Sequence, residues 1–346
     1  MTSNFDPTSI ERLKELLSTP HTITLLGHVS PDGDAVGSTQ ALRMVLESME
    51  HQVTVIYPTH FPASFSCIHG TDRAVIGKVE RERALESLKS AEIIFCLDFN
   101  EPKRVDFLAD QLTDSTATKI LIDHHLHPAD FVDISFSYPE VSSTSLLLYH
   151  LLGALGMNDR IHRDCAEAIY TGMMTDTGGF SYNSEDPSIY TTISDLLEKG
   201  IRKDRLTAEI TRSYTVDKIR LNAHAMLNNL KILPEYHTAI TTLTHREKRI
   251  FNYQVGDTEG LVNVPLEAKD IVFSIFIYEV EKFCKISFRS KGDFPTNKFA
   301  REFFNGGGHL NASGAEVYAP ISEVYDLVLQ ALKVFHPTEE DIPHDW

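Results

Sequence analysis

The stretch GHVSPDGDAVGS, residues 27–38, combines dense charge with little side-chain bulk. His28, Asp32 and Asp34 fall within seven positions, and proline and glycines lie between and around them. The stretch follows the apolar run ITLL at 23–26 and leads into a segment whose apolar residues recur at helical spacing. It therefore connects a buried strand to a helix. Both a solvated turn and a metal site are consistent with its composition.

The alternation of apolar runs and helical patterns continues through the first half of the chain. Further strands are predicted at 53–57, 93–97 and 119–122. Thr8 and Glu11 have the spacing of a capping box. Helices are predicted at 8–17, 35–49, 81–90, 105–112, 143–156, 163–174 and 187–199. This alternation predicts an α/β fold with a mostly parallel sheet that helices cover on both faces.

The pattern changes in the last third of the chain. HTAITTLT, DIVFSIFIYEV and FCKISFRS are typical of strands, GGGH stands at 306–309, and a helical pattern follows from 322 to 335. We therefore expect three parts. They are a first α/β domain over 1–195, a polar helical linker over 196–230, and a smaller α/β C-terminal domain over 231–346.

The composition restricts the partners of this protein. No apolar run reaches the roughly 20 residues that a membrane span requires, and the N-terminus lacks a signal-peptide pattern. We therefore expect a cytoplasmic protein with no membrane partner. The net charge of −17 disfavours long nucleic acids, because a long polyanion needs an extended basic track. The four cysteines form no CxxC pair, which argues against a zinc knuckle and a disulfide framework.

Residue types that ligate metals occur at four separate places. They are His28, Asp32 and Asp34 after the strand 23–26, Asp98 after the strand 93–97, Asp123, His124 and His125 after the strand 119–122, and Asp176 in TDTGG. The carboxyl ends of parallel strands meet at one edge of a sheet, so the first three groups should converge. Asp176 would reach the same edge from the end of a helix.

This set of carboxylates predicts a metal centre. Like charges in close contact repel, and two divalent ions about 3.5–4 Å apart would neutralise them, as in many phosphoester hydrolases. Oxygen-rich ligands with imidazoles suit Mn²⁺ best and leave Mg²⁺ and Zn²⁺ open. Taken singly, each group also has a structural explanation: PDGD as a turn, Asp98 as a helix cap, and TDTGG as a helix end.

The ordered set GHVSPDGDAVGS, LDFN, IDHH and TDTGGF resembles the four motifs of the DHH phosphoesterase superfamily. GGGH at 306–309, preceded by SFRS at 287–290, is similar to the smaller C-terminal domain often attached to these enzymes. Chain length and this C-terminal domain favour the nanoRNase/pAp phosphatase group. Family II inorganic pyrophosphatases share the first domain but have a different second domain.

The resemblance implies a role for each matching position. The implied metal ligands are His28 and Asp32 for one ion, Asp34, His124 and Asp176 for the other, and Asp98 for both. Asp98 and His125 would be catalytic, with His125 lining the phosphate pocket, and Asp123 would orient His124 through its side chain or through backbone contacts. The implied substrate-binding residues are Arg289, Gly306, Gly307, Gly308 and His309.

The resemblance also implies a Mn²⁺-dependent phosphoesterase. Its partners would be short RNA and linear dinucleotides such as pApA, which it would cleave to mononucleotides, and adenosine 3′,5′-bisphosphate, which it would convert to AMP. A phosphoanhydride hydrolase acting on pyrophosphate or short polyphosphate is the alternative enzyme. A nucleotide sensor or scaffold without catalysis is a third hypothesis. The oligomeric state stays open, with a homodimer among the options.

Overall fold

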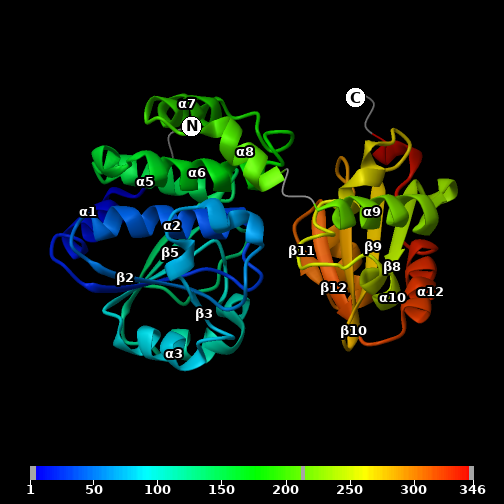
Figure 1. Cartoon of the computed structure of the whole chain (residues 1–346), viewed down its shortest axis with the longest axis horizontal. Helices are drawn as coiled ribbons and strands as arrows, with labels where there is room; N and C mark the ends of the chain where they lie inside the picture. Colours follow the sequence, from blue (N-terminus) through cyan, green and yellow to red (C-terminus); the bar gives the residue numbers. More distant parts are fainter. Residues whose placement is uncertain (1–4, 212–214, 343–346) are drawn as a thin grey trace. The chain divides into compact units, whose positions relative to one another are not determined.

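The computed structural model describes residues 5–211 and 215–342 and divides the chain into two compact units, Met1–Ser213 and Tyr214–Trp346 (Figure 1). Each unit has its own six-stranded sheet. The predicted α/β fold, with a parallel sheet in the first part and a smaller second part, is confirmed. The proposed domain limits at 195 and 230 stay predictions.

The sheet of the first unit is parallel throughout, as the continuous apolar strands predict. Its strands, in order across the sheet, are β3 (Val75–Ile76), β2 (Gln52–Tyr57), β1 (Thr22–Leu26), β4 (Ile93–Leu97), β5 (Thr118–Asp123) and β6 (Ile134–Ser137). The chain winds from β1 toward one edge and then from β4 toward the other. The order therefore reverses between β1 and β4, which is where such sheets form a crevice at their carboxyl edge.

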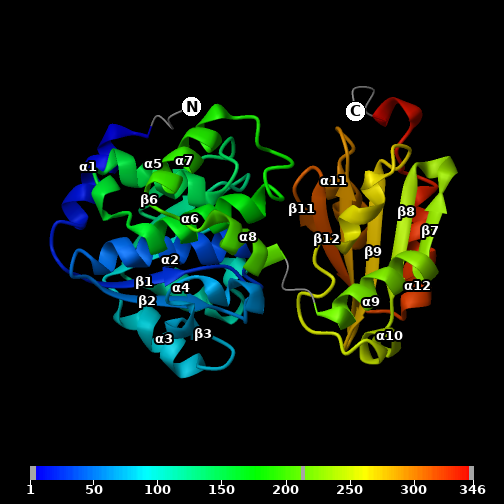
Figure 2. The ribbon, with the colours of Figure 1, turned by 45° about the horizontal axis from the view of Figure 1, so that its top comes forward.

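Helices cover both faces of this sheet (Figure 2). One layer contains α1 (Pro7–Leu16), α2 (Gly33–Glu47), α5 (Thr144–Ala154), α6 (Arg163–Asp176), α7 (Pro187–Glu198) and α8 (Lys203–Thr211), and the other contains α3 (Arg81–Ser90) and α4 (Ala109–Asp114). Successive strand residues enter different cores: Leu25 lies in the core with α2, α5 and α6, whereas Leu26 lies in the core with α3 and α4. Within the described ranges 5–211 and 215–342, none of the helices combines the length and apolar character that a membrane crossing demands.

Two local predictions in this unit are wrong in detail. The first helix is capped by Asp6, whose carboxylate accepts hydrogen bonds from the amides of Thr8 and Ser9, and not by Thr8. Proline is well suited to the first helical position, because it has no amide proton to leave unpaired, so Pro7 favours the earlier start. The segment predicted as one helix over 105–112 is a 3₁₀ helix, Pro102–Leu108, that kinks at Asp106 before α4 begins.

The second unit has a mixed sheet in which β8 and β9 run parallel and the other neighbours run antiparallel. The strands, in order across the sheet, are β11 (Gly307–Gly308), β12 (Ala312–Val317), β10 (Phe283–Ser290), β9 (Phe273–Val280), β8 (Thr238–Leu243) and β7 (Leu230–Leu233). Its helices are α9 (Val216–His224), α10 (His245–Ile250), α11 (Thr296–Phe304) and α12 (Ile321–Leu332). α11 and α12 cover one face through a phenylalanine-rich core, and α9 covers part of the other.

The segment proposed as a linker, 196–230, contains helices that belong to both units. α8 packs against α6 of the first unit. In α9, Leu221 is buried with Leu243 and Phe276 of the second unit. Residues 212–214, within the proposed linker, lie outside the described residues.

The close approach of α2 and α6 generates the first prediction. A methyl group on Gly37 would lie 2.5 Å from the carbonyl oxygen of Ala168, so Gly37→Ala must force these helices apart. We expect the free energy of unfolding to fall by about 1–3 kcal/mol, measured by urea denaturation. The control is Gly153→Ala in α5, where the nearest atom, Asn158 Oδ1, is 3.4 Å away and alanine should stabilise the helix by about 0.5–1 kcal/mol. Equal stability of the two variants would contradict this packing.

A second prediction concerns Glu247 of α10, whose carboxylate contacts His224 of α9. Its carboxylate accepts hydrogen bonds from the amide of Thr244 and the side chain of Asn229, and lies 2.9 Å from His224 Nε2. Burial raises the pKa of Glu247, but these hydrogen bonds outweigh burial and lower it from 4.5 to about 2.

The ionised form of Glu247 therefore stabilises the folded state above pH 4.5, and this stabilisation disappears as the pH falls toward 2. We expect Glu247→Gln to be less stable than the wild type at neutral pH, with a difference that shrinks across this window. Urea denaturation at a series of pH values measures it. A difference that stays constant from neutral pH to pH 2 would show that the charge of Glu247 contributes nothing.

Candidate metal centre

The six predicted metal ligands converge at the carboxyl edge of the first sheet. His28, Asp32 and Asp34 follow β1, Asp98 follows β4, His124 follows β5, and Asp176 ends α6. β1 and β4 are adjacent strands on either side of the point where the strand order reverses. The sheet therefore gathers side chains that are separated by up to about 150 residues of sequence, as expected for a site at such an edge.

In this cluster, two groups of ligand atoms contain the six predicted ligands, and a third group, Asp98, His124 and His125, overlaps both. In one group, His28 Nε2 lies 3.7 Å from Asp32 Oδ1 and 3.5 Å from Asp98 Oδ2. In the other, His124 Nε2 lies 3.3 Å from Asp176 Oδ2 and 3.6 Å from Asp98 Oδ1. Asp34, His124 and Asp176 have ligand atoms within 4.8 Å of one another, so each group could hold one cation.

The two imidazoles of these groups are oriented in the same way. His28 Nδ1 lies 2.8 Å from the carbonyl oxygen of Val29, and His124 Nδ1 lies 3.1 Å from that of Val141. A ring that donates its Nδ1 proton to a carbonyl presents the lone pair of Nε2, which is the usual arrangement of a metal-ligating histidine. In both residues Nε2 is the atom that faces the carboxylates.

Asp32 has two structural roles in the quoted loop. Its carboxylate caps α2 by accepting hydrogen bonds from the amides of Asp34 and Ala35, at 3.0 and 3.1 Å. The same oxygen, Oδ1, is the one that faces His28. The turn interpretation and the metal-site interpretation of PDGD are therefore compatible, because one carboxylate can cap a helix and face the cluster.

Asp98 occupies the centre of the cluster in a strained conformation. It is buried, and its backbone has φ 65°, in the left-handed region that residues other than glycine rarely adopt. Such strain costs on the order of 1–3 kcal/mol and tends to concentrate at functional sites. Asp32 and Asp176, with side chains 48% and 27% exposed, lie on the solvent-accessible side of the cluster.

Sequence reasoning missed the N-terminus of α5 as part of this centre. The backbone amides of Thr144 and Ser145 donate to the two carboxylate oxygens of Asp34, at 2.6 and 2.9 Å. The Thr144 hydroxyl donates to Asp98 Oδ1 at 3.0 Å. The run SSTS at 142–145, before an apolar helical pattern, is the sequence signal for a helix start, but it does not reveal which carboxylates this helix faces.

The electrostatics of the cluster fit a cation. Burial raises the pKa of Asp34 to about 7, with the charge of Asp98 adding to the effect. Burial, together with the charges of Asp34 and Asp98, also raises the pKa of Asp176. These carboxylates therefore resist ionising together, and a bound cation would relieve that resistance.

The pKa of His28 also rises, but for a different reason. Burial alone would lower the pKa of His28, but the carboxylates of Asp32 and Asp98 outweigh it and raise the pKa to about 10. The donor set of carboxylate oxygens and imidazole nitrogens, with no thiolate, suits Mn²⁺, Mg²⁺ or Zn²⁺.

The side chain of Asp123 contacts a different histidine from the one expected. Asp123 Oδ1 lies 2.7 Å from Nδ1 of His125, whereas His124 is oriented by Val141. The prediction that the Asp123 side chain orients His124 is therefore wrong, and an effect through the backbone stays a prediction. Successive residues at a strand end point to opposite sides, so Asp123 shares its side with His125 and not with His124. His125 Nδ1 also lies 3.9 Å from Asp98 Oδ1, and His125 forms a third possible ligand group with Asp98 and His124.

The predicted substrate-binding residues lie together in the second unit. Arg289 of β10 pairs with Ala312 of β12, and Gly308 of β11 pairs with Ser313 in the next row. His309 follows Gly308 and its amide donates to the carbonyl of Ala312 at 2.7 Å. This group is therefore built on three adjacent strands, and Gly307, Gly308 and His309 are exposed.

The structure gives two of the glycines a packing role. A methyl group on Gly306 or Gly308 would overlap the backbone of β12, and Gly308 also has φ 142°. Only Gly307 has open space around its α-carbon. Close approach of strands therefore explains two of the glycines, and close approach of a ligand remains a prediction for Gly307.

Two family models match the chain. A model of the N-terminal domain of the DHH family matches residues 22–173, and a model of the DHHA1 domain matches residues 248–335. The first range contains every residue of the metal-ligand cluster except Asp176, and the second contains Arg289 and the GGGH run.

Known proteins resemble the chain over most of its length. A solved structure described as an exopolyphosphatase-related protein from Bacteroides fragilis is 42% identical, with a TM-score of 0.93, over 96% of this chain and 98% of that one. A bifunctional oligoribonuclease and PAP phosphatase, NrnA, from Bacillus subtilis is 27% identical over 86% of this chain and 90% of its own. The NrnA of Thermus thermophilus is 25% identical over 90% and 89% of the two chains.

The contact between Thr144 and Asp98 generates a prediction about metal affinity. Thr144→Val removes the hydroxyl that holds Asp98 Oδ1 and keeps the side-chain volume. Partners that orient a metal ligand typically contribute about 10–100-fold to affinity, so we expect Mn²⁺ to bind that much more weakly in titration calorimetry.

The matched control for this experiment is Thr171→Val. Thr171 is also buried, but its hydroxyl donates to the carbonyl of Glu167 within α6 and contacts no carboxylate. Equal Mn²⁺ affinity of the two variants would show that Thr144 does not position Asp98.

Proposed function

We propose that this chain, which belongs to the DHH family, is a phosphoester hydrolase that cleaves short oligoribonucleotides or linear dinucleotides to mononucleotides. The observation that carries this proposal is the convergence of four aspartates and two histidines at one sheet edge. Two relatives that align with most of the chain are named as oligoribonucleases and PAP phosphatases, which supports the nucleotide class of substrate. On the same grounds, adenosine 3′,5′-bisphosphate is proposed as a further substrate, converted to AMP.

The proposed metal ligands follow the two groups in the cluster. His28 and Asp32 would hold one divalent ion, Asp34, His124 and Asp176 the other, and Asp98 would contribute to both. We propose Mn²⁺, which accepts both carboxylate and imidazole ligands. Bound divalent ions supply Lewis-acid stabilisation of the charge that develops on phosphate oxygens during hydrolysis.

The protein residues prepare the site for this chemistry. The carbonyls of Val29 and Val141 fix the rings of His28 and His124, and the N-terminus of α5 fixes Asp34. We propose that His125 lines the phosphate pocket, where its hydrogen bond with Asp123 sets the ring orientation. A histidine at this position is a candidate general acid that donates a proton to the leaving oxygen.

In the second unit, we propose that the guanidinium of Arg289 and the exposed backbone of residues 307–309 contact the substrate. Arg289 would bind a phosphate or base edge through its guanidinium, because arginine forms two parallel hydrogen bonds with such groups. The exposed residues Gly307, Gly308 and His309 would contact a terminal phosphate. The net charge of −17 favours a short substrate, since a long polyanion would be repelled beyond these local contacts.

A phosphoanhydride hydrolase is the second candidate. The 42% identical structure from Bacteroides fragilis is described as exopolyphosphatase-related, and this likeness covers nearly the whole chain. A cluster that stabilises charge on a phosphorus centre can serve phosphoesters and phosphoanhydrides alike. Substrate specificity must therefore be measured directly.

The test is hydrolysis by the purified chain of pApA, short RNA of two to five nucleotides, adenosine 3′,5′-bisphosphate, pyrophosphate and a short polyphosphate, each with Mn²⁺. We expect release of mononucleotides from pApA and short RNA. Asp98→Ala should lower the rate by more than about 100-fold, because even partners that only orient a ligand contribute 10–100-fold. Asp110→Asn, an exposed aspartate on α4, is the control and should leave the rate unchanged.

The outcomes separate the candidates. Turnover confined to pyrophosphate or polyphosphate would replace the phosphodiesterase proposal with the anhydride hydrolase. Loss of activity in Asp110→Asn equal to that in Asp98→Ala would remove the link between the cluster and the reaction. No turnover of any compound would favour the sensor or scaffold hypothesis.

A further inference from the structure

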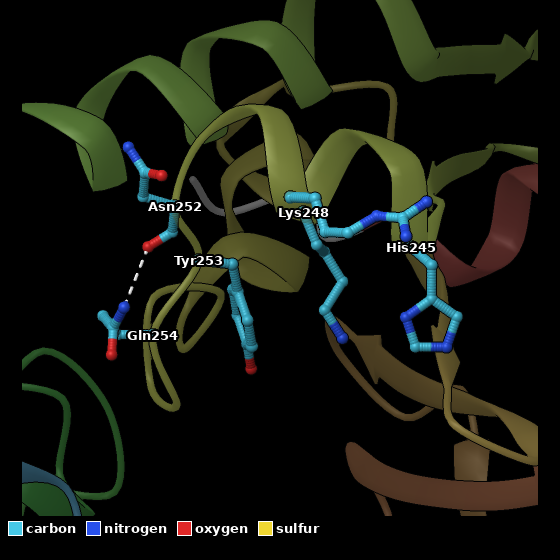
Figure 3. Close-up of a pocket in the computed structure, with 6 residues that line it drawn as sticks. His245, Lys248, Asn252, Tyr253 and Gln254 are labelled. Atoms are coloured by element: carbon cyan, nitrogen blue, oxygen red, sulfur yellow. Dashed lines mark hydrogen bonds between the residues drawn. The ribbon is translucent and has the colours of Figure 1, made fainter.

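A hollow of about 430 Å³ opens on the second unit beside α10 (Figure 3). Its lining residues are His245, Lys248, Arg249, Asn252, Tyr253 and Gln254. Three of these six side chains are basic, one is aromatic and two are carboxamides. The volume is within the range of about 300–1,000 Å³ that small-molecule sites occupy.

The ammonium group of Lys248 is held in place at this hollow. It donates to the carbonyl of Glu279 at 2.9 Å and lies 4.4 Å from the centre of the Tyr253 ring and 5.5 Å from that of Tyr278. Figure 3 shows the side chains of His245, Lys248 and Tyr253 pointing to the same side of α10. A fixed cation beside an aromatic ring loses little side-chain entropy when an anion binds.

The basic side chains of the hollow form no close ion pairs in the described part of the chain, although the charge of Glu279 acts on Lys248. Within residues 5–211 and 215–342, no carboxylate oxygen forms an ion pair with His245, Lys248 or Arg249. The nearby carboxylate of Glu279 accepts a hydrogen bond from the backbone amide of His245 at 2.6 Å. On a chain with a net charge of −17, this local concentration of cationic groups favours an anionic ligand.

The polar rim of the hollow is ordered by its own hydrogen bonds. The side chain of Gln254 donates through Nε2 to the backbone carbonyl of Asn252 at 3.1 Å. The backbone amide of Gln254 donates to the carboxylate of Asp257 at 2.7 Å. Asn252 Nδ2 donates to Asp217 of α9 at 3.0 Å. The carboxamides of Asn252 and Gln254 are therefore fixed at the rim, and the Tyr253 ring lies between them and Lys248. An aromatic ring beside a cation can bind a heteroaromatic base.

The hollow lies far along the sheet from the proposed substrate-binding residues of the same unit. In β9, Glu279, which contacts His245 and Lys248, is five residues from Ser274, which pairs with Arg289. Five residues of a strand span about 17 Å. The hollow and the Arg289 group are therefore separate features of the second unit.

We propose that this hollow is a second binding site, specific for a phosphorylated nucleoside. Lys248 and Arg249, with His245, bind the phosphate, and the base lies against Tyr253 at the rim that Asn252 and Gln254 form. The preference for an anion rests on the lining residues alone, whereas the choice of a nucleotide also rests on the proposed function. The occupant is either a free mononucleotide or one nucleotide of a longer substrate.

The test is calorimetric titration of the full chain with AMP, adenosine and inorganic phosphate in the presence of a metal chelator. Arg249→Glu reverses a charge in the hollow, and Arg246→Glu makes the same change on the same helix at an exposed position that does not line it. We expect AMP to bind about tenfold or more weakly to Arg249→Glu, as for loss of a charge-assisted hydrogen bond, and adenosine to bind more weakly than AMP to the wild type. Equal AMP affinity of Arg249→Glu and Arg246→Glu would overturn the proposal.

Rate measurements then identify the occupant. If it is a nucleotide of the substrate, Arg249→Glu should lower kcat/KM for four- and five-nucleotide RNA more than for pApA. If it is a free mononucleotide, added AMP should change the rate of pApA cleavage in the wild type and Arg246→Glu but not in Arg249→Glu.

The binding experiment is independent of the catalytic proposal. Loss of AMP binding in Arg249→Glu supports the site even if no substrate is turned over. Active enzyme in which both arginine variants bind AMP like the wild type excludes the site and leaves the proposed function intact.

Discussion

The structure of the first unit depends on how it accommodates several carboxylates at one sheet edge. Asp34, Asp98 and Asp176 are close enough that burial and mutual repulsion raise the pKa of Asp34 and Asp176. The protein offsets part of this cost with the backbone amides of α5 and the rings of His28 and His124. The remaining repulsion is what divalent cations would neutralise, so the same constraint explains both the local structure and the proposed chemistry.

Helix packing is coupled to this arrangement. Gly37 and Gly172 let α2 and α6 approach closely, and a methyl group on Gly172 would overlap the hydroxyl of Ser145 and lie 2.6 Å from Asp34 Oδ1. Gly172 therefore leaves room on α6 for the N-terminus of α5 to lie against Asp34. The glycines of the helical layer therefore contribute to the metal centre although none of them could ligate a metal.

The second unit places different groups at different ends of one sheet. Arg289 and the GGGH run lie on β10, β11 and the turn that follows, where Gly306 and Gly308 permit the close pairing of strands. The basic hollow beside α10 lies toward the other end of β9. A sheet with two polar regions can contact more than one phosphate of a nucleotide ligand, which is consistent with the class of substrate we propose.

The sequence alone determined the α/β class, most strands and helices, and the gathering of aspartates and histidines at one sheet edge. Those predictions succeed because period and composition are local properties, and because parallel strands bring their carboxyl ends to a common edge. Only the tertiary structure decided that Asp6 caps the first helix, that Asp123 contacts His125, and that Thr144 holds Asp98. Each of these hydrogen bonds forms because the fold brings one donor and one acceptor, out of several candidates, to a separation of about 3 Å. That choice is made by the packing of whole helices and strands, and no local pattern of residues encodes it.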